Sequence, residues 1–222
     1  MKIISNLQKT IILQFGKLLE SKNFYLTGGT ALSEFYLKHR KSNDLDFFTS
    51  EQEIIAPISF RLEEVLKLAG MSIQRRRGLH SFIELVVTKE DETIIIHLAQ
   101  DSPFRFEEPK EFPEYPGIKV DSLVDIASNK LLCLFGRAEL KDFIDVYFLI
   151  KKGFFKTQEL IEKAKLKDPG FDLYWLGVAF ERIKRFKEDA PEMLLLIEPV
   201  RFQDLLIFFD QWRRDIAREL KF

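Results

Sequence analysis

Two aspartates in a short alternating segment carry the clearest chemical signal in this sequence. Asp44 and Asp46 lie at positions i and i+2 of residues 44–48, so on a strand their carboxylates share one face. Carboxylate oxygens are the ligands with which Mg²⁺ is held beside a triphosphate. A metal held there neutralises phosphate charge and aligns an attacking oxygen for in-line displacement. The sequence therefore predicts a metal site at Asp44 and Asp46, with Mg²⁺ as the cofactor and Mn²⁺ as its alternative.

A glycine pair precedes these acids. The β-prone residues 24–27 end at Gly28 and Gly29, and a helical pattern begins at Thr30. Glycines at a strand-to-helix junction let backbone N–H groups approach an anion, and Thr30 can cap the helix or bond a phosphate oxygen. Either feature alone is more often an ordinary turn or a solvated strand end. In this order, with sixteen positions from Gly28 to Asp44, they match the signature of the nucleotidyltransferase superfamily.

The remaining pattern predicts an α+β fold, with a mixed α/β half followed by a C-terminal helical bundle; the likeness to the nucleotidyltransferase signature implies that the first half is a nucleotidyltransferase-like mixed sheet flanked by helices. Strands are expected at 71–77, 81–88 and 93–99 as an antiparallel meander, between helices at 6–21 and 53–69 and a proline-rich linker at 103–116. Gly70 is expected to follow the second helix at C′. Further helices are expected at 121–136, 139–152, 157–165, 171–187, 191–197 and 201–221. The predicted domains are 1–118 and 119–222.

The composition and charge of the chain argue against several classes of protein. The chain has 222 residues, 46% of them hydrophobic, and a net charge of −1, which argues against a dedicated nucleic-acid coat or a polybasic membrane binder. Cys133 is the only cysteine, so no intrachain disulfide and no CxxC zinc site is expected. No export signal or bilayer-spanning run is evident. We expect a cytoplasmic protein without a membrane partner.

The sequence resembles the AbiEii/AbiGii toxin family of nucleotidyltransferases over roughly residues 20–150. Five segments carry this resemblance: 27–32, 39–48, 101–105, 125–132 and 137–147. The resemblance implies a polymerase-β-like core in which Gly28, Gly29 and Thr30 hold phosphates and Asp44 and Asp46 hold Mg²⁺. It further implies that Lys130 contacts the nucleoside triphosphate and that Asp142 or Asp145 completes the helical side of the pocket.

One position departs from the superfamily pattern. A later strand usually supplies a third carboxylate, but here His97 occupies that place in residues 94–99. A histidine could act as the base, because its unperturbed pKa is about 6.5. It could equally be an ordinary half-buried strand residue in an altered or inactive site.

Several basic residues are candidates for the same site. Lys130 lies beside an apolar helical face, where it either reaches solvent or binds an anion, and Arg137 follows seven positions later on the same stripe if the helix continues. Arg137 and Lys141 could pair with Asp142 or Asp145 and so fix Lys130; exposed ion pairs are the alternative. Arg40 could bind the nucleotide or brace the two aspartates.

Residues 75–77 are the one basic run. On a strand Arg75 and Arg77 share a face, where they could contact RNA phosphate; a charged, solvated strand edge is the more ordinary interpretation.

Taken with the resemblance, these features predict a Mg²⁺-dependent nucleotidyltransferase. It would move a nucleoside monophosphate from an NTP to an RNA (tRNA-like) or protein acceptor, as the toxin of a toxin–antitoxin or phage-defence pair with a cognate antitoxin protein. The alternative is a catalytically degenerate nucleotide- or partner-binding protein with the same fold.

Overall fold

The chain forms two units. The computed structural model describes residues 2–220. The first unit contains residues up to 36 together with 41–122, and the second contains 37–40 together with the residues from 123 onward. The chain thus enters the second unit for four residues, returns to the first, and leaves it finally after Ser122.

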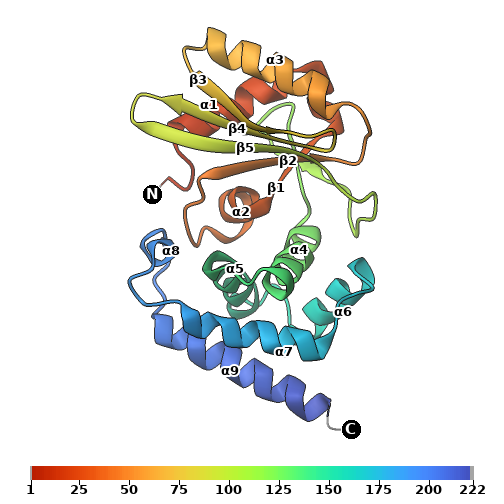
Figure 1. The fold of residues 1–222 in the computed structure, drawn as a ribbon, viewed down its shortest axis with the longest axis vertical. Helices are drawn as coiled ribbons and strands as arrows, with labels where there is room; N and C mark the ends of the chain where they lie inside the picture. The colour runs from red at the N-terminus through yellow and green to blue at the C-terminus, as the bar shows by residue number, and fades with distance from the viewer. Residues whose placement is uncertain (1, 221–222) are drawn as a thin grey trace. The chain divides into compact units, whose positions relative to one another are not determined.

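A mixed sheet is the centre of the first unit (Figure 1). Within the described chain its seven strands lie in the order β3-β4-β5-β2-β1-β7-β6. The pairs β2–β5 and β1–β7 are parallel and the others are antiparallel, which confirms the predicted meander of β3, β4 and β5. The strands are β1 (Tyr25–Thr27), β2 (Asp44–Thr49), β3 (Ser72–Gly78), β4 (Phe82–Lys89), β5 (Glu92–Gln100), β6 (Lys110–Glu111) and β7 (Lys119–Val120).

Helices α1 (Asn6–Gly16) and α3 (Ile55–Leu68) cover one face of this sheet, and α2 (Gly28–Ala31) lies on the other face (Figure 1). A 3₁₀ segment η1 (Leu19–Asn23) follows α1, and a π-helical segment η2 (Leu32–Leu37) continues α2. Phe15 of α1 stacks on Phe47 of β2 with ring centroids 4.0 Å apart. Burial of each such side chain contributes about 1.5–3 kcal/mol to stability. The face of the sheet covered by α1 and α3, which we call the helical face, therefore holds much of the core of this unit.

The proline-rich residues 103–116 are not a linker, contrary to the sequence prediction. They belong to the first unit, where β6 pairs with β7 at the sheet edge. Tyr115 is buried; its hydroxyl donates to Glu34, and its ring packs edge-on against Phe35. The prolines exclude a helix and a central strand, as expected, but aromatic side chains between them supply enough apolar surface to fix the segment.

The second unit is helical, as predicted. Phe143 packs edge-on against Phe209 at 4.9 Å, and Phe180 contacts Trp212 at the same distance, so aromatic rings form much of its core. Along residues 2–220 we find no helix both long and apolar enough to cross a membrane. The helices of the second unit are α4 (Leu123–Gly136), α5 (Leu140–Lys151), α6 (Thr157–Lys167), α7 (Leu173–Glu181), the 3₁₀ turn η3 (Arg182–Arg185), α8 (Pro191–Leu194) and α9 (Phe202–Glu219).

Residues 37–40 join this helical unit through backbone hydrogen bonds. The carbonyl of His39 accepts from the N–H groups of Ile197 and Glu198 at 2.8 and 3.0 Å, and Arg40 forms an isolated antiparallel bridge with Leu196. The four-residue segment is therefore held by the loop between α8 and α9.

Candidate active site

Strand β2 presents the acid pair as the sequence predicted. Its burial alternates strictly: Leu45 and Phe47 point into the helical core, and Asp44 and Asp46 are half-buried on the opposite face. The apolar residues anchor the strand, so the two carboxylates are held on one side of a rigid element.

Gly28 makes room for the carboxylate of Asp46. Residues Thr27 and Asp46 are direct partners across the antiparallel pair β1–β2, so the residue after Thr27 meets the Asp46 side chain. A Cβ atom added to Gly28 would lie 1.9 Å from Asp46 Oδ2 and 2.8 Å from its Cγ. Gly28 also has φ +72°, a conformation that glycine adopts without strain. Both observations require glycine at this position, for a reason that sequence spacing alone did not indicate.

Thr30 holds the start of β2 through a buried hydrogen bond. It is fully buried, and its hydroxyl donates to the backbone carbonyl of Asp44. The expected helix cap is not made, because α2 begins at Gly28 with Thr27 as its N-cap and no side-chain cap bond. Gly29 is buried in the first turn of the same helix. The contact that Thr30 makes therefore fixes where β2 begins.

His97 lies beside Asp46, on the next strand. Parallel pairing of β2 with β5 sets the two residues in register, and His97 Nδ1 lies 2.8 Å from Asp46 Oδ1. On its other side, His97 Nε2 lies 3.6 Å from Glu84 Oε2 of β4. Burial acts to lower the pKa of His97, but its hydrogen bond to Asp46 and the charges of Asp46, Asp44 and Glu84 outweigh burial and raise that pKa above its usual value. At this distance the Nδ1–H group donates to the Asp46 carboxylate, so Nδ1 is already engaged in a hydrogen bond.

Glu84 is a residue that the sequence analysis did not single out. It faces the same side of the sheet as His97, because β4 and β5 pair them directly. The available signal was a lone glutamate at an alternating position of an otherwise apolar strand.

The two aspartates fit a Mg²⁺ ion by the chemistry of their donor atoms. Both are half-exposed, share a face, and offer hard oxygen ligands, and Mg²⁺ is often bound by one or two carboxylates with water and phosphate oxygens completing its shell. Among residues 2–220 there is no group of three or more His, Cys, Asp or Glu side chains placed to hold a metal. Further ligands would therefore come from solvent and substrate.

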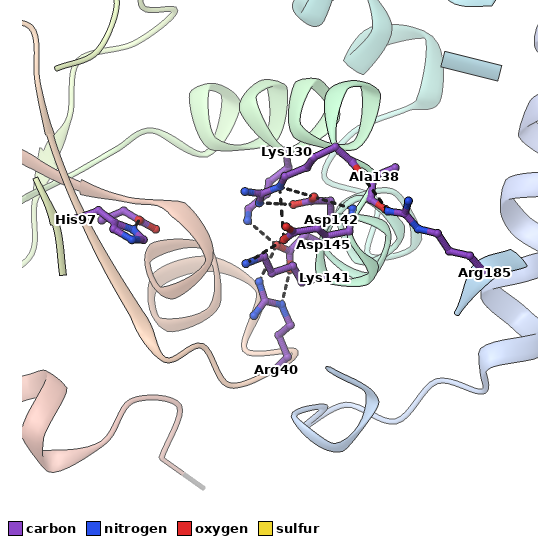
Figure 2. A network of polar contacts seen from close by, with 11 residues as sticks. Arg40, His97, Lys130, Ala138, Lys141, Asp142, Asp145 and Arg185 are labelled. Carbon is purple, nitrogen blue, oxygen red and sulfur yellow. Dashed lines mark hydrogen bonds and ion pairs between the residues drawn. The ribbon is translucent and has the colours of Figure 1, made fainter. Parts of the chain in front are cut away.

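In the second unit, the buried carboxylate of Asp145, itself a predicted site residue, gathers two of the other predicted residues, Arg40 and Lys130, together with His39 (Figure 2). Asp145 of α5 is fully buried; its Oδ1 accepts from Arg40 Nε at 2.7 Å, and its Oδ2 accepts from Arg40 Nη2 and pairs with Lys130 Nζ, both at 2.8 Å. His39 Nε2 lies 2.7 Å from Oδ1. We name these four residues the Asp145 cluster. Lys130 is only 6% exposed, so it does not extend into solvent.

Electrostatics keeps the members of the Asp145 cluster charged, except for its histidine. Burial acts to raise the pKa of Asp145, but Arg40 and Lys130 hold it well below the usual range. Burial acts to lower the pKa of Lys130, and the charge of Asp145 raises it above its usual value. For His39, burial lowers the pKa despite its contact with Asp145. Arg40, Lys130 and Asp145 together carry one net positive charge.

Arg137 lies outside the Asp145 cluster. Helix α4 ends at Gly136, and Ala138 takes φ +50° before α5 begins, so the predicted continuous stripe from Lys130 through Arg137 is interrupted. Arg137 makes two bonds of 2.9 Å to the buried carboxylate of Asp142, one of its two expected partners, while Lys141 pairs with Glu139 at 3.2 Å. Neither cation fixes Lys130.

A mixed sheet with a strand-borne acid pair beside a glycine-started helix, joined to a helical bundle, defines the nucleotidyltransferase class of folds, as predicted. A sequence profile described as "Nucleotidyl transferase AbiEii toxin, Type IV TA system" matches residues 12–221. The chain belongs to this AbiEii nucleotidyltransferase toxin family. The match extends well past residue 152, where the sequence analysis had found no resemblance.

The chain is also similar to one further protein sequence and to two solved structures. An uncharacterized protein of Aquifex aeolicus (strain VF5) is 30% identical over 184 residues, which cover 80% of each chain. A crystal structure of a candidate nucleotidyltransferase from Helicobacter pylori matches with a TM-score of 0.59 and 18% identity, over 97% of this chain and 93% of that one. The H. pylori protein JHP933 matches with a TM-score of 0.55 and 18% identity, over 97% and 90%. At this identity the two structures support the fold.

Proposed function

We propose that this protein is a Mg²⁺-dependent nucleotidyltransferase that transfers a nucleoside monophosphate from an NTP to a hydroxyl of an RNA or protein acceptor. As a family member it would act as the toxin beside a cognate antitoxin protein. RNA, in particular a tRNA-like molecule, is the acceptor that we favour.

The observation that carries this proposal is the way in which Asp46 is held. Gly28 leaves space for its Oδ2, His97 binds its Oδ1, and β2 keeps it on the same face as Asp44. A solvated strand end needs neither a glycine that leaves room for the carboxylate nor a buried threonine bonded to the first carbonyl of the strand. Such positioning is typical of groups that must hold a geometry during a reaction.

In this proposal Asp44 and Asp46 bind the ion, and the backbone around Gly28 and Gly29 receives phosphate oxygens at the start of α2. When bound, Mg²⁺ would neutralise charge on the phosphates and orient them for in-line attack. His97 keeps Asp46 oriented by donating from Nδ1 to Oδ1. Because Nδ1 is bonded to Asp46 and Nε2 faces Glu84, we assign His97 a positioning role and not that of the base.

Lys130 and Arg40 are the groups of the second unit suited to a polyphosphate. Their two charges exceed the one negative charge of Asp145, which holds both side chains in fixed positions. Arg137 and Asp142 support the connection between α4 and α5 through their mutual bonds.

A second candidate is a nucleotide- or partner-binding protein that has lost turnover. The contact between His97 and Asp46 favours it, because an imidazole bonded to Oδ1 of the carboxylate competes with a metal ion for that oxygen. In this case the His97→Asp variant should gain metal affinity; an unchanged affinity would argue that this position does not face the metal.

The first experiment is calorimetric titration of each of the four NTPs with and without Mg²⁺. We expect Mg²⁺-dependent binding of at least one NTP by the wild type and its loss in Asp46→Asn, with an unchanged circular dichroism spectrum. The matched control is Asp91→Asn, which removes one exposed carboxylate from the same unit, in the turn between β4 and β5. Full binding by the Asp46 variant would refute the assignment of the metal to the acid pair.

A further inference from the structure

We infer that the acceptor of this enzyme is a single-stranded segment of RNA whose phosphates bind Arg76 and Arg77 at the free edge of the sheet. This inference rests on the proposed function, and it assigns a binding role to a basic run that the active site does not use. Strand β3 is the terminal strand of the sheet, and both arginines are exposed there.

A β-bulge separates the three arginines of this run. Arg75 pairs with Leu85 of β4, and Arg77 pairs with Glu84, so one extra residue, Arg76, lies between the two pairs. The sequence analysis expected Arg75 and Arg77 on one face; the bulge places them on opposite faces of the sheet. Bulges commonly redirect a side chain next to active sites.

Arg75 stabilises the helical face of the sheet. Its guanidinium donates to Glu63 and to Ser59 of α3 and lies over the ring of Phe60, 4.5 Å from the centroid. Arg76 and Arg77 have no such partners within residues 2–220: neither side chain forms an ion pair or a hydrogen bond there. Their charges remain available for a ligand.

Arg77 stands in register with the acid pair. Direct cross-strand partners lead from Arg77 to Glu84, from Glu84 to His97 and from His97 to Asp46, and direct partners project from the same face. Three strand spacings separate Arg77 from Asp46, which is about 14 Å. An extended polynucleotide crossing the strands can thus place a phosphate at the edge and a terminal hydroxyl near the acids.

An aromatic ring lies beside this path. Phe82 is two residues before Glu84 on β4, hence on the same face, and its half-buried ring lies 5.5 Å from that of His97. Basic edges combined with aromatic side chains are how proteins bind single-stranded nucleic acid without reading its sequence. A protein strand added to this edge is disfavoured by the bulge and by the consecutive arginines, which are devices that prevent strand pairing.

The test is RNA binding followed by fluorescence anisotropy at several salt concentrations, using a short fluorescein-labelled single-stranded RNA. Each phosphate contact to single-stranded nucleic acid contributes about 0.7 to the slope of log K against log salt concentration. We expect the double variant Arg76→Ala, Arg77→Ala to lower this slope by about 1.4, and Arg77→Lys to keep it. The control, Lys17→Ala with Lys22→Ala, removes the same charge from exposed residues around η1 and should leave the slope unchanged.

The Phe82→Leu variant tests the proposed stacking contact independently of the phosphate contacts. Stacking of one base on an aromatic ring corresponds to roughly 5- to 150-fold in affinity, and it releases no counterions. This variant should therefore weaken RNA binding without changing the salt slope. Unchanged affinity would refute the stacking contact.

Failure of this inference and failure of the proposed function are distinguishable. An unchanged slope in the arginine variant, an equal loss in the control, or no RNA binding by the wild type would each overturn the RNA site. Titration of NTP and Mg²⁺ into the same arginine variant measures the proposed nucleotide site separately, and we expect it to match the wild type. Binding of a partner protein lost together with these arginines, while RNA binding stays intact, would also overturn the inference.

Discussion

Replacing Gly28 by alanine tests the geometry of the acid pair directly. The new Cβ would lie 1.9 Å from Asp46 Oδ2, and contacts under 3.0 Å force a displacement. Rotation of the carboxylate alone does not relieve the clash, because the added atom is also 2.8 Å from Cγ and 3.2 Å from Cβ of Asp46. We therefore expect the Asp46 side chain to rotate away about χ1, with a small shift of its Cβ, and to lose its 2.8 Å contact with His97.

Gly70→Ala is the matched control. Gly70 has φ +78°, close to the +72° of Gly28, but an added Cβ meets nothing within 4 Å. Both substitutions cost about 1–2 kcal/mol for an alanine in the left-handed region. Only Gly28→Ala loses the bond to a charged group as well, worth about 1.5 kcal/mol at this partly exposed site. The difference between the two variants isolates the clash with Asp46.

Three measurements distinguish Gly28→Ala from Gly70→Ala. Denaturant unfolding should show Gly28→Ala less stable than Gly70→Ala by about 1.5 kcal/mol. Nitrogen-15 NMR of the imidazoles should show a changed His97 signal in the first variant only. Mg²⁺-dependent NTP affinity should fall in the first variant and persist in the second. The inference that glycine is needed at position 28 to leave room for the Asp46 side chain would be refuted by equal stability, an unchanged His97 signal and equal NTP affinity in the two variants.

Two further predictions concern the Asp145 cluster, and the fluorescence of the two tryptophans, both in the second unit, reports on them. Asp145→Asn leaves Arg40 and Lys130 buried without their counter-charge, so urea unfolding should show a loss of about 3–5 kcal/mol; a midpoint equal to that of the wild type would contradict the role of this carboxylate. His39 has a lowered pKa when folded, so the unfolded chain takes up the proton first: stability should fall by up to about 1.4 kcal/mol per pH unit as pH drops below about 6.5. His39→Gln should remove this slope, and an unchanged slope would assign it elsewhere.

Local patterns in the sequence predicted the first unit well. Alternation identified β2 and the shared face of Asp44 and Asp46, and Gly70 ends α3 with a positive φ as expected. The position of His97 beside the acids also followed from strand order. Each of these features depends on residues close together in the chain or on a single strand pairing.

Features that depend on register or on distant pairing were not predictable in this way. The need for glycine at position 28 arises only when β1 and β2 align Thr27 with Asp46. The bulge that moves Arg77 to the other face depends on how β3 meets β4. The partners Arg40 and Asp145 lie 105 positions apart, and periodicity carries no information over such a separation.

The four-residue entry of the chain into the second unit has a consequence for dissection of this protein. Cleavage after residue 122 follows the main boundary between the two units. It nevertheless leaves His39 and Arg40 on one fragment and Asp145 and Lys130 on the other. Neither fragment would then contain a complete Asp145 cluster. During synthesis, Arg40 emerges from the ribosome more than a hundred residues before the carboxylate that it binds. A nascent or truncated chain therefore carries an acid pair without a finished helical unit, and only a chain that contains residues 37–40 together with those from 123 onward can assemble both.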